Sequence, residues 1–149
     1  MTYLAPIIVL SLGVTLYLVG LVMKRIAAKG WGPLAAAYPL AQPPTGPQTR
    51  LSWVSVGGSG AVGHKSAVVA GASAAGLSLR MPLLGWMGHP PMLIPWSACG
   101  PFRAEKQLLS SNRYTTSVRL PNGAAVALRF EDNEFARAIR PWAHVEEGR

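Results

Sequence analysis

Residues 4–23 read LAPIIVLSLGVTLYLVGLVM, and this stretch contains no charged side chain. A helix of about 20 residues rises ~30 Å, which matches the hydrocarbon thickness of a bilayer. Lys24 and Arg25 end the apolar run abruptly. The sequence therefore predicts a single transmembrane helix over residues 4–23, and the rest of the chain is organised around this anchor.

The charges beside this segment predict its orientation. Only residues 1–3 precede it, whereas Lys24, Arg25 and Lys29 follow it closely. An excess of Lys and Arg marks the cytoplasmic side of a span. We therefore expect the N-terminus outside and the following domain in the cytoplasm. A cleaved signal peptide is the alternative, but it would need a basic segment first and a shorter apolar core.

One face of the predicted span carries small residues and an aromatic one. Gly13, Tyr17 and Gly20 lie on this face, because seven residues make about two helical turns. Small residues let a second helix approach closely. The pattern suits either a helix–helix contact or plain exposure to lipid, and the sequence leaves both open.

Residues 24–47 form the predicted juxtamembrane segment. After the basic residues, Gly30 and Gly32 interrupt the helix, and a short second helix is expected over 33–38. Residues 39–47 read PLAQPPTGP, which predicts a semi-rigid extended linker.

Basic and aromatic residues in this segment are of the kinds that settle at the membrane interface. We expect this role for Lys24, Arg25, Lys29, Trp31 and Tyr38. The alternative for the two aromatic residues is a packing contact beneath the domain.

Residues 48–149 read as a mainly β domain. Short segments rich in β-branched and aromatic residues alternate with Gly- and Pro-containing turns, which predicts strands. The expected strands are 51–56, 65–70, 77–81, 92–96, 102–108, 114–120 and 125–130. Asn122-Gly123 predicts a hairpin between the last two. We expect a bent antiparallel sheet or split barrel of six or seven strands, without parallel pairing because no β-α-β alternation occurs.

A C-terminal amphipathic helix is predicted to close this sheet. Asp132 or Asn133 can cap its start. An apolar stripe at helical spacing follows, formed by Phe135, Ala138, Ile139 and Trp142. The polar tail 144–149 is expected to be frayed.

The composition restricts the partners. The net charge is +8, and Glu105 is the only acid between Arg50 and Arg129. A basic domain tied to a membrane is attracted to anionic headgroups. Nucleic acid is the other usual partner of such charge, but the anchor favours lipid, and we expect no nucleic-acid partner. Cys99 is the only cysteine, so no internal disulfide can form.

Three motifs suggest nucleotide, phosphate or metal binding, but each lacks neighbouring residues that such a site requires. Residues 58–63 match G-x-G-x-x-G, yet a strand is expected next and no acid follows about 20 residues on. His64 breaks the spacing of a phosphate-binding loop in the same stretch. The histidines and Cys99 show no local ligand spacing. We therefore expect no cofactor, no metal and no catalytic residues.

One predicted loop, residues 82–92, is unusually apolar. It contains Leu83, Leu84, Trp86 and Met87. Apolar loops usually bury against something. This one is expected either to cover the core of its own domain or to contact lipid or a neighbouring subunit.

Two stretches carry a resemblance. Residues 31–39 (WGPLAAAYP), and GLSL at 76–79 followed by HPPMLIPWS at 89–97, resemble motifs of small uncharacterised bacterial single-pass membrane proteins. The IPWS strand and the closing helix are also similar to bacterial pleckstrin-homology-like domains. The resemblance implies a seven-stranded bent sheet capped by a helix, a lipid- or protein-docking role, and the bacterial inner membrane. It implies no catalytic residue.

These observations predict a membrane-anchored, non-catalytic docking or accessory protein. We expect it to be a small subunit or scaffold of a larger inner-membrane complex, such as an energy-transducing one, with other membrane subunits as partners. One alternative is a module that senses anionic lipid without a protein partner. A second alternative is a small membrane-tethered enzyme, which needs a convergent polar pocket; His64, His89 and Glu105 lying together would support it.

Overall fold

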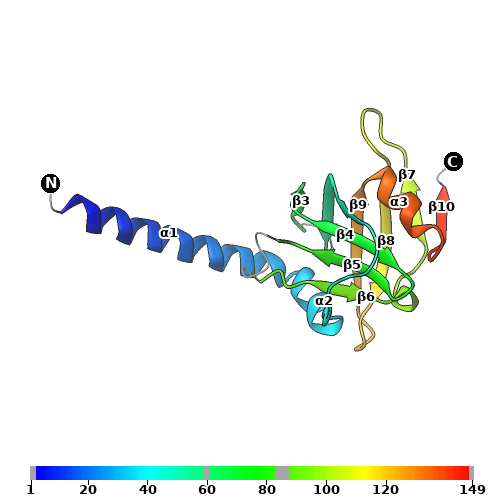
Figure 1. Ribbon diagram of the computed structural model, residues 1–149, viewed down its shortest axis with the longest axis horizontal. Coiled ribbons are helices and arrows are strands. Elements are labelled where there is room, and N and C mark those ends of the chain that lie inside the picture. The colour runs from blue at the N-terminus through cyan, green and yellow to red at the C-terminus, as the bar shows by residue number, and fades with distance from the viewer. Residues whose placement is uncertain (1–2, 59–60, 83–87, 148–149) are drawn as a thin grey trace.

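A long helix, α1 (Leu4–Ala27), projects from a compact β domain in the computed structural model, which describes residues 3–58, 61–82 and 88–147 (Figure 1). The most apolar 18-residue window of α1 has a mean hydropathy of 2.3, and none of it is buried in the molecule. α1 is therefore long and apolar enough to cross a membrane. It includes the predicted span and continues through Lys24 and Arg25.

The described part of the chain forms ten strands in two sheets. The four-stranded sheet has the order β1–β4–β5–β6, made of Gln48–Arg50, Val69–Ser73, Gly76–Arg80 and Met92–Ile94. The six-stranded sheet has the order β10–β7–β8–β9–β2–β3, made of Val145–Glu147, Phe102–Glu105, Arg113–Arg119, Ala125–Glu131, Trp53–Val56 and Gly63–Lys65. The sheets are separate and do not close into a barrel. The expected six or seven strands therefore underestimated the β content.

One strand pair is parallel, contrary to the prediction of a purely antiparallel sheet. β10 runs parallel to β7, with Val145 opposite Phe102. The predicted frayed tail is therefore a strand as far as Glu147. Its formation depends on a partner about 40 residues earlier in the chain, and a polar sequence without periodicity gives no local sign of that pairing.

The chain passes between the two sheets where one predicted strand divides. The expected strand 65–70 is split, because β3 ends at Lys65 and β4 begins at Val69. Ser66, between them, has a left-handed backbone (φ 52°). The apolar inner faces of both sheets pack on one core that includes Val54, Leu79 and Phe130.

The last hairpin and the last helix agree with the predictions. Asn122 accepts a hydrogen bond from the Ala124 N–H at 2.9 Å, and Gly123 has φ +88°. Asp132 caps α3 (Asn133–Ile139) by accepting from the Phe135 N–H at 2.9 Å.

α3 is shorter than its predicted apolar stripe. It ends before Trp142, which is 45 % exposed. Ala136, rather than Ala138, joins Phe135 and Ile139 in the core. The helix packs against β4.

The juxtamembrane segment belongs to the domain. α2 (Trp31–Ala37) places Trp31 and Leu34 in the same core as the strands, and Trp31 is only 1 % exposed. Its indole N–H donates to the Pro90 carbonyl at 2.8 Å. Gly30 lies so close to the start of the β2–β3 connection that a Cβ there would be 2.4 Å from the Val56 carbonyl oxygen. The packed unit therefore begins about 20 residues before the predicted boundary at residue 48.

Replacement of this tryptophan tests how far the domain depends on α2. We expect Trp31→Ala to lower the free energy of unfolding by about 3–5 kcal/mol, because a fully buried indole and its hydrogen bond are lost. Trp142→Ala, at a half-exposed position, is the matched control and should cost under about 1 kcal/mol. Denaturant unfolding of the detergent-solubilised chain measures both. Equal effects would show that α2 is not part of the folded unit.

Candidate functional site

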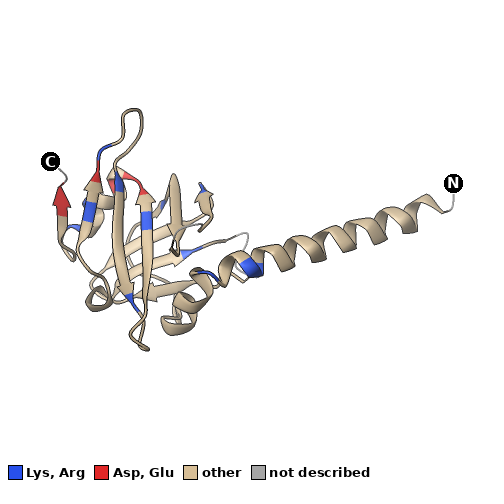
Figure 2. Cartoon of the chain, turned by 180° about the vertical axis from the view of Figure 1, so that it is seen from behind, with Lys and Arg blue, Asp and Glu red and all other residues tan. Residues whose placement is uncertain are grey.

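The basic residues of the predicted membrane interface lie where the domain begins. Lys24, Arg25 and Lys29 are all exposed. They are at the end of α1 that meets the β domain, opposite the N-terminus (Figure 2). Their side chains are free to reach headgroups if α1 spans a bilayer.

The aromatic residues of that prediction are placed differently. The Trp31 ring has no surface that lipid could reach, so burial in the core corrects its assignment to the interface. Tyr38 is half-buried, and its hydroxyl donates to the Arg119 carbonyl at 2.6 Å. Both residues therefore make packing contacts within the domain, which was the alternative to a role at the membrane interface.

The face of α1 with small residues is open. Nothing described lies within 4 Å of a Cβ built on Gly13 or Gly20, and Tyr17 is exposed. No described residue of the chain covers this face. A second helix and lipid both remain compatible with it.

The predicted contact residues Leu83, Leu84, Trp86 and Met87 lie outside the described residues. The chain on their C-terminal side packs into the domain, since His89 is fully buried and Pro90 accepts the hydrogen bond from Trp31.

Two histidines meet beside the Trp31 ring. The ring centroids of His64 and His89 are 5.2 Å apart, and the Trp31 ring lies 5.4 Å from His89 and 6.4 Å from His64. Burial, and to a smaller degree the neighbouring His89, lower the pKa of His64 below its ordinary 6.5.

Glu105 does not join these histidines. It lies on β7, and β8, β9 and β2 separate that strand from the β3 strand of His64. The described residues contain no group of three or more potential metal ligands. The constellation that would have supported the enzyme alternative is therefore not assembled.

The lone cysteine is poorly suited to nucleophilic chemistry. Cys99 pairs with Val118 through an isolated β-bridge and is partly buried. Burial raises the pKa of its thiol to about 11. The thiolate, which is the reactive form, is therefore scarce near neutral pH.

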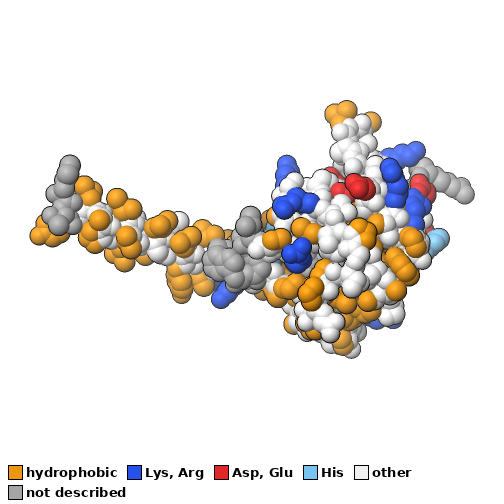
Figure 3. All heavy atoms as spheres, in the orientation of Figure 1, with side chains coloured by type: hydrophobic (Ala, Val, Ile, Leu, Met, Phe, Trp, Pro, Cys, Tyr) orange, Lys and Arg blue, Asp and Glu red, His pale blue; other side chains and the backbone are white. Residues whose placement is uncertain are grey.

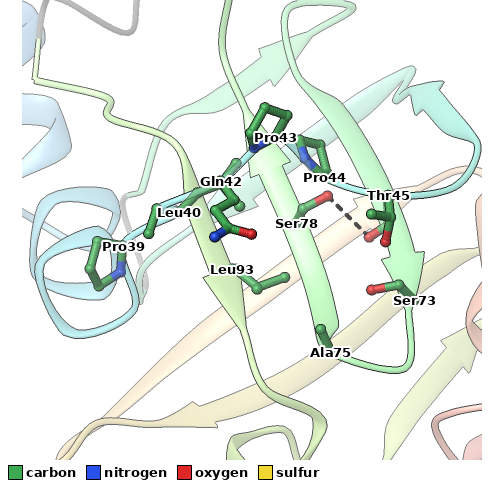
Figure 4. A pocket seen from close by; sticks show the side chains of 12 residues that line it. Pro39, Leu40, Gln42, Pro43, Pro44, Thr45, Ser73, Ala75, Ser78 and Leu93 are labelled. Carbon is green, nitrogen blue, oxygen red and sulfur yellow. Dashed lines mark hydrogen bonds between the residues drawn. The ribbon is translucent and has the colours of Figure 1, made fainter.

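A groove lies between the proline-rich linker and the four-stranded sheet (Figure 4). The linker runs beside β6, where the Leu40 N–H donates to the Pro91 carbonyl at 3.2 Å. The hollow is about 290 Å³ in volume and is lined by small, apolar and amide or hydroxyl side chains, including Gln42, Ser73, Ser78 and Leu93. None of its described lining residues is ionisable, so it holds no general acid or base.

The most exposed apolar residues of the domain were missed by sequence reasoning. Leu108 and Leu109 are each 100 % exposed, at the tip of the loop between β7 and β8. The predicted strand 102–108 ends instead at Glu105, the last residue of β7 paired with β8. Ser110, Ser111 and Asn112 are turn-forming residues that could have indicated this loop.

Hydrogen bonds hold the base of this loop. Gln107 donates to a carboxylate oxygen of Glu131 at 2.9 Å, and the Asn112 N–H donates to the Asn133 side chain at 3.1 Å. The leucines are thus presented on an anchored loop.

Comparisons with protein-family models, with curated proteins and with solved structures found no match to this chain. The resemblance to small bacterial membrane proteins and to pleckstrin-homology-like domains stays a prediction from the sequence.

The His64 environment predicts a dependence of stability on pH. Unfolded His64 titrates near 6.5, whereas folded His64 takes up its proton only at lower pH. The unfolded state therefore binds more protons as the pH falls below 6.5, and stability should decrease until the folded pKa is passed. Thermal unfolding between pH 7.5 and 5 measures this slope. His64→Gln should make this slope shallower, and a slope equal to that of the wild type would contradict the assignment.

The raised pKa of Cys99 predicts slow alkylation. At pH 7.5 we expect iodoacetamide to label the native chain at least tenfold more slowly than the chain in denaturant, because both the thiolate fraction and access are reduced. Intact-mass spectrometry over time measures both rates. Similar rates would show an accessible, activated thiol.

Proposed function

We propose that this chain is a single-pass membrane protein whose cytoplasmic β domain is a non-catalytic docking module, an accessory or scaffold subunit of a larger inner-membrane complex. The observation that carries the proposal is the direct coupling of an exposed apolar helix to a folded domain. Ala27, the last residue of α1, is already part of the core, and Trp31 follows it there.

This coupling supports docking because it limits where the domain can be. A long flexible linker would let the domain explore the cytoplasm. Here the packed domain begins immediately beyond Lys24 and Arg25, which suit the headgroup region. A domain held at a fixed distance from the membrane surface has a high effective concentration relative to neighbouring proteins in the same membrane.

Leu108 and Leu109 give this module a contact point. Figure 3 shows the tip of the domain that carries exposed apolar atoms standing well away from the end of α1. A bilayer that surrounds α1 would leave this tip in water. A buried leucine contributes about 1.5–3 kcal/mol relative to an exposed one, so a protein partner that covers the pair gains substantially.

The lipid-sensing alternative is favoured by a separate observation. Lys24, Arg25 and Lys29 are exposed together at the junction of α1 with the domain, and the chain carries a net charge of +8. Each such residue adds ~1 kcal/mol of attraction to an anionic surface. Lipid attraction can seat the domain without excluding a protein partner. The enzyme alternative has less support. Among the described residues, the groove lined by Gln42, Ser73, Ser78 and Leu93 offers no ionisable residue, and the hollow on the same linker that Arg80 lines offers no carboxylate or histidine.

Purification from native membranes tests the docking function. We expect the tagged full-length chain, extracted in mild detergent, to migrate as a complex larger than the monomer. Leu108→Ser with Leu109→Ser should weaken retention of the partner by tenfold or more, corresponding to a loss of about 1.4 kcal/mol or more at the contact.

The matched control is Val62→Ser, another exposed apolar position, at 47 % exposure on the β2–β3 connection. It should retain the complex. A lone monomer at every detergent concentration would refute the docking function, and equal retention by the leucine variant would remove the tip as its contact point.

A further inference from the structure

Basic side chains outnumber acidic ones on the outer face of the six-stranded sheet, where Glu105, Glu131 and Glu146 lie on the same side as four arginines and Lys65. Arg103 on β7, Thr115 on β8 and Arg129 on β9 lie in one row across three neighbouring strands. Arg113 and Arg119, at the two ends of β8, point to the same side because side chains alternate along a strand. Figure 2 shows this face with its basic residues distributed over the strands. We call Arg103, Arg113, Arg119 and Arg129 the arginine face.

The opposite side of the same strands is the core. Tyr114, Val118 and Leu128, the sequence neighbours of these arginines, are buried. The alternation therefore places the arginines on the side opposite the core, where Arg103 and Arg119 are exposed and Arg113 and Arg129 are half-buried. Between them the face carries short side chains, Thr115, Ser117, Ala125 and Ala127, so it offers an open strip that an extended chain could follow.

Two of the four arginines already have acidic partners. Arg113 hydrogen-bonds to Glu131 and lies over the Trp53 ring, 4.7 Å from its centroid. Arg103 is 3.6 Å from Glu146 in an exposed pair. Burial alone would raise the pKa of Glu131, but the hydrogen bonds from Arg113 and Gln107 outweigh burial and lower that pKa. The carboxylate therefore stays ionised, and Arg113 balances its charge.

Arg119 and Arg129 have no such partner. Across the described residues, neither has a carboxylate within ion-pairing distance. Arg119 is exposed, and Arg129 is half-exposed beside Thr115. Two guanidinium groups without internal counter-charges thus remain on an uncovered sheet face, which favours an external anion.

The orientation of the arginine face argues against anionic lipid headgroups as the ligand of Arg119 and Arg129. In Figure 2 the strands of the six-stranded sheet stand side by side toward the viewer, while α1 lies along the plane of the picture. The face therefore looks sideways from the axis of α1. A membrane crossed by α1 would lie at one end of the domain rather than flat on this face.

Nucleic acid fits less well than a polypeptide. Sequence-tolerant binding of single strands relies on aromatic side chains on which bases stack. Among the described strands, Trp53 is the one aromatic residue on this face, and Arg113 already covers its ring. Carboxylates need no such platform, because planar guanidinium groups bind them bidentately.

We propose that the arginine face binds an acidic polypeptide segment of a neighbouring membrane protein, with carboxylates of that segment paired to Arg119 and Arg129. The inference rests on the proposed docking function and names the chemistry of its partner. The apolar tip formed by Leu108 and Leu109 is a separate contact, so the two can be tested independently.

The test uses the full-length chain in nanodiscs of phosphatidylcholine, which carry no net charge. Fluorescence anisotropy of a short labelled poly-glutamate peptide measures binding. We expect Arg119→Gln with Arg129→Gln to weaken binding about tenfold. Arg119→Lys with Arg129→Lys keeps the charge but not the bidentate geometry, and should fall between this variant and the wild type.

Arg137→Gln with Arg140→Gln is the charge-matched control. Both residues are exposed on or next to α3, away from the arginine face, and Arg140 pairs with the exposed Glu147. This control should weaken binding less than twofold. Circular dichroism of each variant verifies that the fold is intact.

Several outcomes would overturn the proposal. Equal losses in the two glutamine variants would mean that only net charge matters, and undetectable binding to the wild type would remove the site. Stronger binding of oligothymidylate, or of phosphatidylserine vesicles, in place of the peptide would assign the face to nucleic acid or to lipid. If the complex from native membranes survives while the peptide test fails, docking stands and only its acidic partner is refuted.

Discussion

The burial of Trp31 is the interaction on which the arrangement of this molecule depends. Its side chain fills the core between the sheets, and its indole N–H reaches the backbone carbonyl of Pro90, 59 residues later in the chain. A helix of 24 residues therefore enters a β domain with almost no free chain between them. Every surface outside the core, basic or apolar, has a defined position relative to the axis of α1 because of this contact.

The same contact separates two kinds of surface. If α1 spans a membrane, the basic residues at its domain end lie near the headgroups. The tip of the β7–β8 loop stands away from that end, and the arginine face looks sideways from the axis of α1 (Figures 2 and 3). Attraction to lipid and recognition of protein can thus act on one domain without competing for the same residues.

Short sequence patterns correctly predicted the elements that depend on interactions between residues close together in the chain. The apolar run predicted α1, Asn122-Gly123 predicted the β8–β9 hairpin, and Asp132 was correctly identified as a possible cap of α3. Long-range pairing was not predictable in this way. The alignment of β10 with β7 depends on residues that are distant in sequence, and the division between β3 and β4 depends on the chain changing sheets at Ser66.

The candidate surfaces were predicted least well, because exposure is a property of the assembled fold. A tryptophan beside a transmembrane segment is typical of the interface, and only the packing of α2 shows that this one is in the core. Leu108 was predicted as the last residue of a strand, and Leu109 next to it received no role. Nothing in the sequence indicated that the four arginines share one face, because they are distributed over three strands and are brought together only by the register of the sheet.

The proline-rich linker has a consequence for self-association. It runs along β6, an outermost strand of the four-stranded sheet, where Pro39 forms an isolated bridge with Met92. The Tyr38 carbonyl just before the linker accepts from the Leu93 N–H at 2.9 Å. An uncovered outermost strand is a template for pairing with another chain, and prolines resist such pairing because they lack an N–H. If α1 holds many copies in the two dimensions of a membrane, the copies would meet often, and the linker would then protect this edge of the sheet from pairing between them.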